Sequence, residues 1–320
     1  MLARLFSIMA VAFLACSAAG AAGLKRLEIP AVDGGQALFG AVWFPCALPN
    51  GRVRLGRILV PGVKDCPVLG AKLPLVVISH GYSGWFGGHR DTAATLADAG
   101  YVVAAITHRS EYDRRWRYER PAAIKRLIDY MLRAWPDRTR IDRRRIGFFG
   151  FSRGGYTGLV AIGGVPDFRR ITRHCRLVPS ARFCRPSRGS KRPGTRKFTA
   201  TKRPYIHDTR IKAAVIAAPL GVVFGREGLK SVSVPVQLWR TVRDERVKFP
   251  YHAEAVSKAL PIKPDYRVVQ AGHFAFLAPC APRQTRAVPA VCRDADGFDR
   301  AAFHQRFNAE ILRFFEKHLR

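Results

Sequence analysis

The order of apolar and polar stretches along the chain predicts alternating strands and helices. Short apolar runs with few polar interruptions are typical of strands buried in a sheet. Such runs occur at Leu73 to Ser79, Val102 to Thr107, Ile146 to Phe149, Ile211 to Ala217, Val234 to Trp239 and Tyr266 to Gln270. Helical patterns separate most of them, near Asp91–Ala99, Arg120–Ala134, Gly154–Ile162 and Pro250–Leu260, and a last helix is expected at Asp299–His318. An N-terminal strand pair is expected around residues 27–30 and 37–45, before a turn-rich segment that ends near Gly70.

This alternation predicts an α/β fold with a mostly parallel central sheet and helices on both faces. In open sheets of this kind, ligands bind beyond the carboxyl ends of the strands. Polar segments follow four of the expected strands, namely "SHGYSGW", "GFSRGG", "RTVRDERV" and "AGHFAF". A functional site is therefore expected at this edge of the sheet.

The segment from Gly150 to Gly154 matches the pattern G-x-S-x-G, with Ser152 at its centre. In that pattern a sharp strand-to-helix turn exposes the serine oxygen, and the glycines make the turn sterically possible. Short matches of this kind also arise by chance in loops. Here an apolar run precedes the pattern and a helical pattern follows it, so Ser152 is predicted to be a nucleophile rather than a loop hydroxyl.

A serine hydroxyl needs a base that takes its proton, and His273 is the strongest candidate. His273 follows the last expected strand, where a loop can carry an imidazole over the turn. His80, His89 and His108 also follow strands, but they precede the serine in the chain. We assign His80 to a histidine-glycine turn and His108 to a surface loop.

The base needs an acid that orients it, and Asp244 lies after a strand between Ser152 and His273. A buried carboxylate there would fix the imidazole tautomer and stabilise its charged form. The order serine, acid, histidine is the order of the α/β-hydrolase triad. Glu245, the adjacent residue, is the alternative acid. Asp244 could also have a purely structural role, in an ion pair with a neighbouring arginine.

An oxyanion formed at the nucleophile needs fixed hydrogen-bond donors. One is expected from the backbone N–H of the residue after the nucleophile, which is Arg153. The second is expected from Tyr82, in the loop after the first main strand, where Gly81 permits a tight turn. The Tyr82 ring is also a candidate wall of the acyl pocket.

The segments "VVISHGYSG", "RIGFFGFSRGG", "VPVQLWRTVRDERV" and "AGHFAFLAPC" resemble those of α/β-hydrolases in the dienelactone-hydrolase-like branch, near secreted hydrolases related to platelet-activating-factor acetylhydrolases. The resemblance covers roughly residues 25–320. It implies a nucleophile at Ser152, an acid at Asp244, a base at His273 and oxyanion amides at Tyr82 and Arg153. Typical dienelactone hydrolases have cysteine at the nucleophile position. The serine found here favours carboxylic ester hydrolysis over lactone hydrolysis.

The first 23 residues have the features of a signal peptide, with an early arginine, an apolar stretch and small residues before the expected cleavage site. We therefore expect an exported protein, periplasmic or secreted, with one α/β-hydrolase domain at residues 24–320. "FLAC" permits the alternative that Cys16 is lipidated. Export favours disulfides among the six remaining cysteines. Six cysteines allow 15 pairings, and we expect sequence neighbours to pair: Cys46 with Cys66, Cys175 with Cys184, and Cys280 with Cys292. The last pair brackets a segment rich in loop-forming residues, which we expect to be a loop that the disulfide clamps after His273.

The chain has a formal net charge of +32. Residues 169–203 hold 13 lysines and arginines and no acidic residue, within a basic surface excursion expected at about residues 166–208. Its proline, glycine and serine content favours a loop without a packed element. Such a charge can steer anionic membranes or polyanions to the surface, although solvated arginines also explain it. No motif predicts a metal site, a cofactor or specific nucleic-acid recognition.

Two classes of function remain. The leading hypothesis is an exported serine hydrolase that cleaves small-molecule or lipid esters through an acyl-enzyme on Ser152, with lactone or phospholipid acyl hydrolysis as a variant. The alternative is a protein on a hydrolase fold that binds polyanions or anionic lipids. An intact Ser152, Asp244 and His273 in the expected order favours the enzyme.

Overall fold

The computed structural model describes residues 22–32, 36–49, 51–56, 58–109, 115–179, 184 and 204–319. The expected signal peptide with Cys16 and most of the basic excursion lie outside these residues. Within them, ten strands form a sheet in the order β10-β9-β8-β7-β5-β6-β2-β1-β4-β3. Their bounds are β1 (Ala22–Ile29), β2 (Leu38–Pro45), β3 (Gly51–Leu55), β4 (Ile58–Lys64), β5 (Leu73–Ser79), β6 (Val102–Thr107), β7 (Ile141–Phe151), β8 (Ile211–Ala217), β9 (Val236–Thr241) and β10 (Asp265–Val269).

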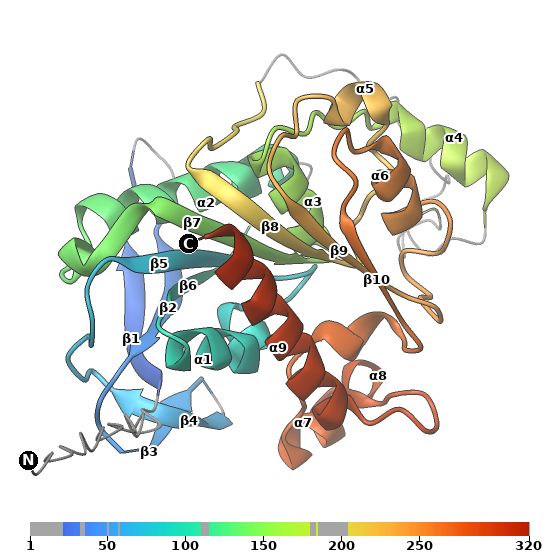
Figure 1. Cartoon of the computed structure of the whole chain (residues 1–320). Coiled ribbons are helices and arrows are strands. Elements are labelled where there is room, and N and C mark those ends of the chain that lie inside the picture. The colour runs from blue at the N-terminus through green and yellow to red at the C-terminus, as the bar shows by residue number, and fades with distance from the viewer. Residues whose placement is uncertain are drawn as a thin grey trace, which may run out of the picture.

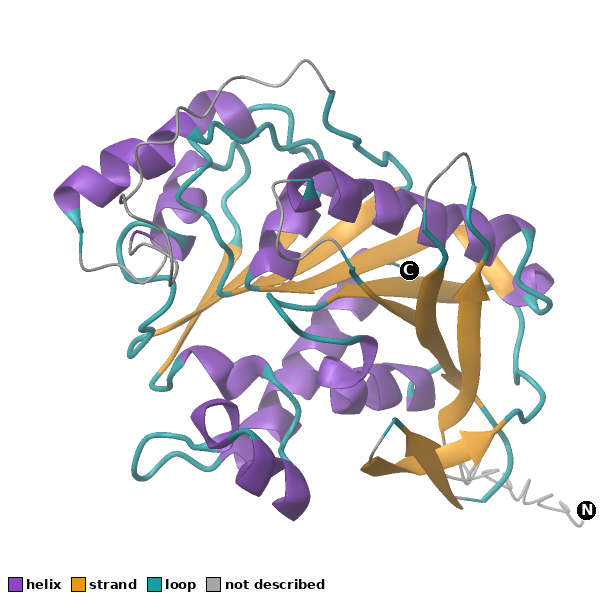
Figure 2. Ribbon diagram, turned by 180° about the vertical axis from the view of Figure 1, so that it is seen from behind, coloured by secondary structure: helices purple, strands orange, loops and turns teal. Residues whose placement is uncertain are grey.

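The predicted α/β class is confirmed, because β10, β9, β8, β7, β5 and β6 all run parallel while β2 pairs antiparallel with β6 and with β1. Helices cover both faces of this sheet (Figures 1 and 2). The helices are α1 (Arg90–Asp98), α2 (Trp116–Arg133), α3 (Arg153–Ala161), α4 (Arg169–Leu177), α5 (Arg226–Leu229), α6 (Ala253–Ala259), α7 (Pro282–Ala287), α8 (Pro289–Cys292) and α9 (Arg300–His318). Short 3-10 helices are η1 (Phe86–His89), η2 (Arg138–Arg140) and η4 (His273–Phe276).

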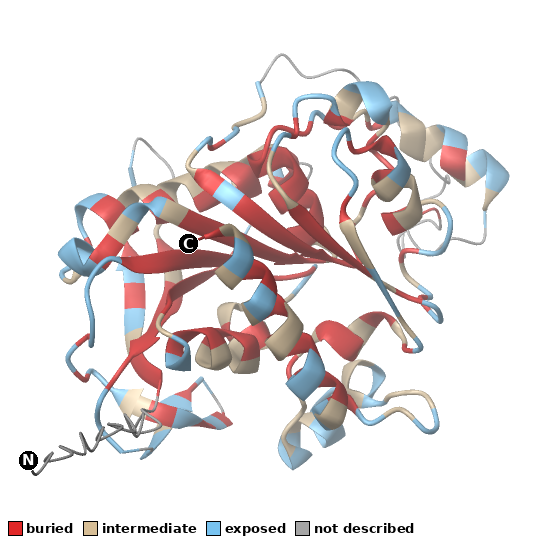
Figure 3. Cartoon of the chain, in the orientation of Figure 1, coloured by how far each residue is buried: buried red, intermediate tan, exposed pale blue. Residues whose placement is uncertain are grey.

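Each central strand is buried on both faces, as Figure 3 shows. In β7, Phe148 belongs to the apolar cluster that includes residues of α2, α3 and α6, whereas Phe149 belongs to the cluster on the opposite face that includes residues of α1 and α9. Neither side of such a strand needs polar residues. This two-sided burial explains why the central strands read as nearly continuous apolar runs in the sequence.

Some parts of the prediction were wrong. The segment before Gly70 is not merely turn-rich, because β3 and β4 form an antiparallel hairpin there. Arg169–Leu177 is the helix α4, although we expected no packed element in the basic excursion. His108 is buried rather than on a surface loop, with 4% of its surface exposed.

The three predicted disulfides between sequence neighbours are confirmed: Cys46–Cys66, Cys175–Cys184 and Cys280–Cys292. Paired cysteines persist in oxidising compartments, so they suggest a periplasmic or extracellular location. Among the described residues, no helix combines the length and the apolar character that crossing a membrane requires.

Candidate active site

Ser152 lies at the sharp turn between β7 and α3. Its backbone has φ 56° and ψ −111°, a strained conformation for a residue with a side chain. Its N–H donates to the Ala217 carbonyl over 2.8 Å, and its carbonyl accepts from the N–H of Tyr156 and of Leu220. These bonds hold the turn, which leaves the serine side chain partly exposed at the end of β7.

The glycines around Ser152 are required by the close packing of the turn. A Cβ on Gly154 would lie 1.8 Å from the Ser79 carbonyl oxygen, and one on Gly150 would lie 2.3 Å from the Gly154 carbonyl oxygen. Both oxygens belong to the backbone, the first at the end of the paired strand β5 and the second in the first turn of α3, so neither can move without disturbing its element. The sequence pattern therefore matches the steric demand of this turn.

His273 and Asp244 lie beside Ser152 and form a hydrogen-bonded chain with it. The His273 Nε2 atom is 3.0 Å from the Ser152 Oγ atom, and its Nδ1 atom is 2.8 Å from the Asp244 Oδ2 atom. Because a carboxylate only accepts, Nδ1 carries the proton and Nε2 is left to accept the serine hydroxyl. The ring of Phe151 packs against the His273 ring at 4.9 Å between centroids.

Asp244 is buried and fully hydrogen-bonded. Its Oδ1 atom accepts from the backbone N–H of Arg246 at 2.8 Å and of Val247 at 2.7 Å, and its Oδ2 atom accepts from the Thr241 hydroxyl at 3.0 Å. Burial by itself raises the pKa of Asp244, but the bonds from His273 and the two backbone amides outweigh it and lower that pKa. The group is therefore a carboxylate. The alternative residue, Glu245, is exposed.

The acid and base loops are also joined by their backbones. The Val242 N–H donates to the Val269 carbonyl over 2.8 Å, and the Arg243 N–H donates to the Ala271 carbonyl over 3.0 Å. These bonds extend the β9–β10 pairing past the ends of both strands. Each loop thus restricts the position of the other.

The loop after β5 packs directly on the serine turn. A Cβ on Gly81 would lie 3.0 Å from the Phe151 ring and 3.4 Å from the Ser152 Cβ atom. The Gly81 carbonyl accepts from the His80 Nδ1 atom at 2.6 Å and from the Gly84 N–H at 3.2 Å. Because a peptide bond is planar and trans, holding this carbonyl also fixes the direction of the Tyr82 N–H.

A cluster of buried polar side chains lies beneath this loop, and the sequence did not predict it. The His80 Nε2 atom accepts from the His108 N–H at 2.9 Å, so the His80 ring is neutral and donates through Nδ1. Arg120 donates to the His80 carbonyl, and the His108 ring lies 2.9 Å from the Ser79 hydroxyl. Burial and then the Arg120 charge lower the pKa of both histidines well below the ordinary value. The only sequence signal was the histidine-glycine turn, because the partners lie 28 to 40 residues away.

The Arg153 side chain links the serine turn to the loop after β5. Its guanidinium lies 4.3 Å from the centroid of the Tyr82 ring and 4.3 Å from that of the Trp116 ring. Contacts of this kind are attractive by about 0.5–2 kcal/mol. The two residues predicted to supply oxyanion amides are thus in contact through their side chains.

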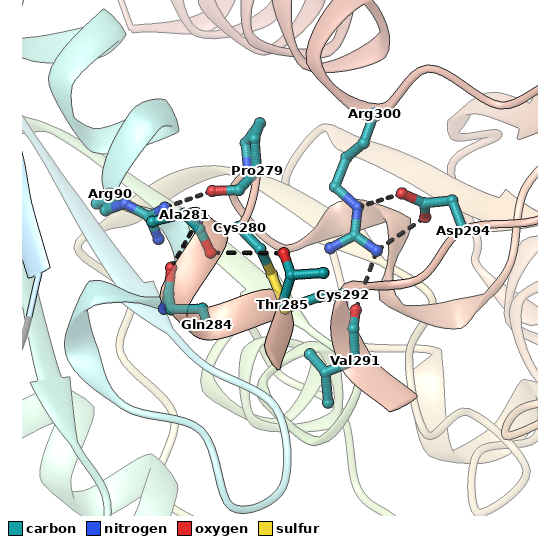
Figure 4. The surroundings of a disulfide bond; sticks show 10 residues. All are labelled: Arg90, Pro279, Cys280, Ala281, Gln284, Thr285, Val291, Cys292, Asp294 and Arg300. Atoms are coloured by element: carbon teal, nitrogen blue, oxygen red, sulfur yellow. Dashed lines mark hydrogen bonds and ion pairs between the residues drawn. A yellow bond between two sulfur atoms is a disulfide. The ribbon is translucent and has the colours of Figure 1, made fainter. Parts of the chain in front are cut away.

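A cross-linked segment follows the base (Figure 4). The Cys280–Cys292 disulfide closes it, and Arg90 donates to the Pro279 carbonyl at one end. At the other end Arg300 binds both carboxylate oxygens of Asp294 at 2.8 and 2.9 Å. We expected a loop here, whereas the segment contains α7 and α8.

In the part of the chain that the structure describes, no group of three or more histidine, cysteine or acidic side chains is arranged to hold a metal ion. The side chains that follow β7, β9 and β10 are those of a nucleophile, an acid and a base. The arrangement is suited to transferring a proton from Ser152 to His273 while Asp244 stabilises the resulting imidazolium.

Residues 66–176 match the family model BD-FAE, an esterase-type α/β-hydrolase family. This segment contains Ser152 but neither Asp244 nor His273. A solved ferulic acid esterase from Streptomyces cinnamoneus is similar in structure, with a TM-score of 0.61 and 18% sequence identity, over 95% of this chain and 91% of that chain. A search of curated protein sequences found no match.

The structural likeness shows that the chain has the fold of these esterases. The fold alone does not identify a reaction, because 625 solved chains match it and such folds carry many activities. The family match and the likeness together support the prediction of a carboxylic ester hydrolase. Neither comparison distinguishes the dienelactone-hydrolase-like branch.

Proposed function

We propose that the protein is an exported serine hydrolase that cleaves carboxylic esters through an acyl-enzyme on Ser152. The observation that carries the proposal is the hydrogen-bonded chain from the Ser152 hydroxyl through His273 to Asp244, with distances of 3.0 and 2.8 Å. These distances are within the range in which a base takes a proton from a hydroxyl. The esterase family match over residues 66–176 supports the same reaction.

In the first half of the reaction, the Ser152 oxygen attacks the ester carbonyl carbon while His273 Nε2 takes the hydroxyl proton. The Asp244 carboxylate stabilises the imidazolium. The tetrahedral intermediate then collapses, the bond to the alcohol oxygen breaks, and His273 returns its proton to that oxygen. In the second half, His273 Nε2 takes a proton from a water molecule while the water oxygen attacks the acyl carbon. The bond from that carbon to the Ser152 oxygen then breaks, His273 returns the proton to the Ser152 oxygen, and the acid is released.

The oxyanion of each tetrahedral intermediate needs donors, and we assign them to the backbone N–H groups of Tyr82 and Arg153. Arg153 is the first residue of α3, so its N–H lies at the positive end of a helix. The Tyr82 N–H belongs to the loop that His80 holds through the Gly81 carbonyl. Loss of one such donor costs about 10²- to 10³-fold in turnover in another serine hydrolase.

Within the esterases we assign the chain to the dienelactone-hydrolase-like branch, near platelet-activating-factor acetylhydrolases, on the motifs around Tyr82, Ser152, Asp244 and His273. A serine nucleophile favours carboxylic esters of small molecules or lipids over lactones. Lactone and phospholipid acyl hydrolysis remain variants of the same proposal, and a panel of esters of increasing acyl length separates them.

A fluorophosphonate probe tests the nucleophile. We expect it to label the wild-type protein on Ser152, and we expect Ser152→Ala to lose labelling and about 10⁶-fold in ester turnover without unfolding. Circular dichroism and the melting temperature of the variant provide the folding control. Ester hydrolysis within tenfold of wild type in the variant would contradict the mechanism.

We further propose that the basic segment at residues 169–203 contacts an anionic membrane surface or a polyanion. Within α4, Arg173 and Arg176 are exposed, whereas Arg169 pairs with Asp167. Binding to vesicles that contain phosphatidylglycerol, or to heparin, should weaken between 50 and 500 mM salt, because salt screens exposed charges. Arg173→Gln/Arg176→Gln should bind more weakly than the wild type at the lower salt concentration. Binding by the variant equal to that of the wild type at both salt concentrations would refute the contact.

A further inference from the structure

The short helix that carries His273 is held by one side chain from α9 and one from η1. In η4, the Ala275 carbonyl accepts from the His304 Nε2 atom at 2.7 Å, and the Phe276 carbonyl accepts from the His89 Nδ1 atom at 3.0 Å. His304 belongs to α9, and His89 ends η1 directly before α1. Both imidazoles are buried, with 3% and 1% of their surface exposed. The position of the base therefore depends on two donors outside its own loop.

His304 differs from His89 in having an acceptor at each ring nitrogen. Its Nδ1 atom lies 2.5 Å from the Asp91 Oδ2 atom, opposite the bond from Nε2 to the Ala275 carbonyl. Neither a carboxylate nor a carbonyl donates a proton, so both ring nitrogens must carry one. The geometry thus makes His304 an imidazolium. A charged donor forms a shorter and stronger hydrogen bond to a carbonyl than a neutral one.

Asp91 is placed to maintain that charge. It lies in the first turn of α1, and its Oδ2 atom also accepts from the Asn308 amide at 3.0 Å. Burial raises the pKa of Asp91, but the bond from His304, its charge and the Asn308 amide outweigh this and bring that pKa to about 2. The pair has the same form as Asp244 and His273, with an acid that orients an imidazole.

A third bond between α1 and α9 lies outside the contact of Asp91 with His304 and serves as a comparison. The Thr92 hydroxyl donates to the Asn308 Oδ1 atom at 2.7 Å, and both residues are buried. This bond joins the same two helices as the bond between Asp91 and His304. It makes no bond to η4. Thr92 reaches Asp91 only through Asn308, so Thr92→Val removes a bond between the two helices and leaves both bonds of His304 in place.

We propose that His304, held as an imidazolium by Asp91, is a positioning residue that sets the place of His273 through the Ala275 carbonyl. The proposal rests on the proposed function of His273 as the base. Ala275 is two residues from His273, within the same helical turn, so loss of its donor displaces the imidazole relative to Ser152. A misplacement of about 1 Å costs on the order of 10²-fold in rate.

The kinetic test compares His304→Gln and Asp91→Asn with Thr92→Val. We expect the first two variants to lower kcat by about 10- to 100-fold with KM changed less than about threefold, because substrate contacts are unaltered. Thr92→Val should lower the melting temperature but keep kcat within about twofold of wild type. A kcat of His304→Gln within twofold of that of Thr92→Val overturns the proposal.

Proton NMR of the free enzyme provides a test that needs no activity. The two aspartate-histidine pairs should give two low-field proton resonances, of which His304→Gln removes one and broadens or shifts the one from His273. A His273 resonance unchanged in His304→Gln overturns the positioning role, also where His304→Gln is too unstable for kinetics. If the fluorophosphonate probe fails to label the wild type, the proposed function fails, and this resonance still decides the positioning role.

Discussion

At the scale of single residues, backbone groups and the His273 side chain together prepare the candidate site. Ser152 is exposed by a strained turn that its own backbone bonds hold, and Asp244 is kept ionised chiefly through bonds to His273 and two backbone amides. Such groups cannot rearrange without breaking the turn. The serine, imidazole and carboxylate are therefore in place before a substrate arrives.

Substitutions of the two adjacent acids, at positions 244 and 245, are expected to have very different effects on kcat. Asp244→Asn should lower kcat by about 10⁴-fold, as the corresponding change does in another serine hydrolase, because an amide facing Nδ1 favours the wrong imidazole tautomer. Glu245→Gln should keep kcat within about twofold, because the side chain is exposed and away from His273. Steady-state kinetics of both variants check this, with melting temperatures as the folding control. A larger loss in Glu245→Gln than in Asp244→Asn would reverse the assignment of the acid.

The sequence predicted some residues of the site better than others. Ser152, His273 and Asp244 were found because each follows a strand at the same edge of the sheet, in an informative order. His304 and Asp91 gave no signal, since they lie 213 residues apart on helices that otherwise show ordinary amphipathic patterns. His108 was misplaced because its burial depends on Arg120 and Ser79, which no local pattern connects to it.

At the scale of elements, prediction succeeded where burial is two-sided and failed where local composition is mixed. The bounds of β5, β6 and β8 were predicted exactly from their apolar runs. The β3–β4 hairpin was missed because Pro61 and Gly62 lie inside β4 and arginines alternate along β3. The helix α4 was missed because its four arginines and one histidine leave few apolar positions to show a helical period.

Removal of the Cys280–Cys292 disulfide tests whether the segment after His273 helps to hold His273 in place. Closing a loop of this size stabilises by about 3 kcal/mol in the chain-entropy model. We expect Cys280→Ser/Cys292→Ser to lower kcat before the sheet unfolds, because the segment that the disulfide closes begins four residues after the helix that carries His273 ends. Activity and circular dichroism are followed together along a temperature ramp.

The Cys46–Cys66 disulfide is the matched control for that experiment. It links the end of β2 to the segment after β4, on the N-terminal side of the sheet. Cys46→Ser/Cys66→Ser should lower the melting temperature without a separate loss of activity below it. If both double variants lose activity and structure in parallel, the segment after His273 has no special role in holding the base.

At the scale of the whole molecule, four buried histidines stay neutral and so add nothing to the large positive charge of the chain. His80, His89, His108 and His252 are each no more than 4% exposed. Burial is the largest cause that lowers the pKa of all four, to about 4 for His89 and to about 3 for His252. In a chain with a net charge of +32, four more cations inside the fold would add repulsion to the cost of desolvation.

These histidines predict that the protein loses stability as the pH falls. An unfolded imidazole binds its proton near pH 6.5, whereas the folded ones stay neutral below that value, so unfolding takes up protons as soon as the pH drops through 6.5. The free energy of unfolding continues to fall until the pH reaches the pKa values of these histidines in the folded protein. Asp98 acts in the opposite sense, because burial raises its pKa to about 6 despite a hydrogen bond from Ala22, and it releases at most about one proton.

Urea unfolding between pH 7.0 and 5.5 measures the effect. We expect the free energy of unfolding to fall with a slope that corresponds to about two to three protons taken up per molecule near pH 5.5. His252→Asn should reduce this uptake by about one proton, and its amide oxygen can still accept the bond that the Gly221 N–H donates to His252 Nδ1. Uptake below about one proton in the wild type would mean that the buried imidazoles gain protons without unfolding, and that the core tolerates charge at these positions.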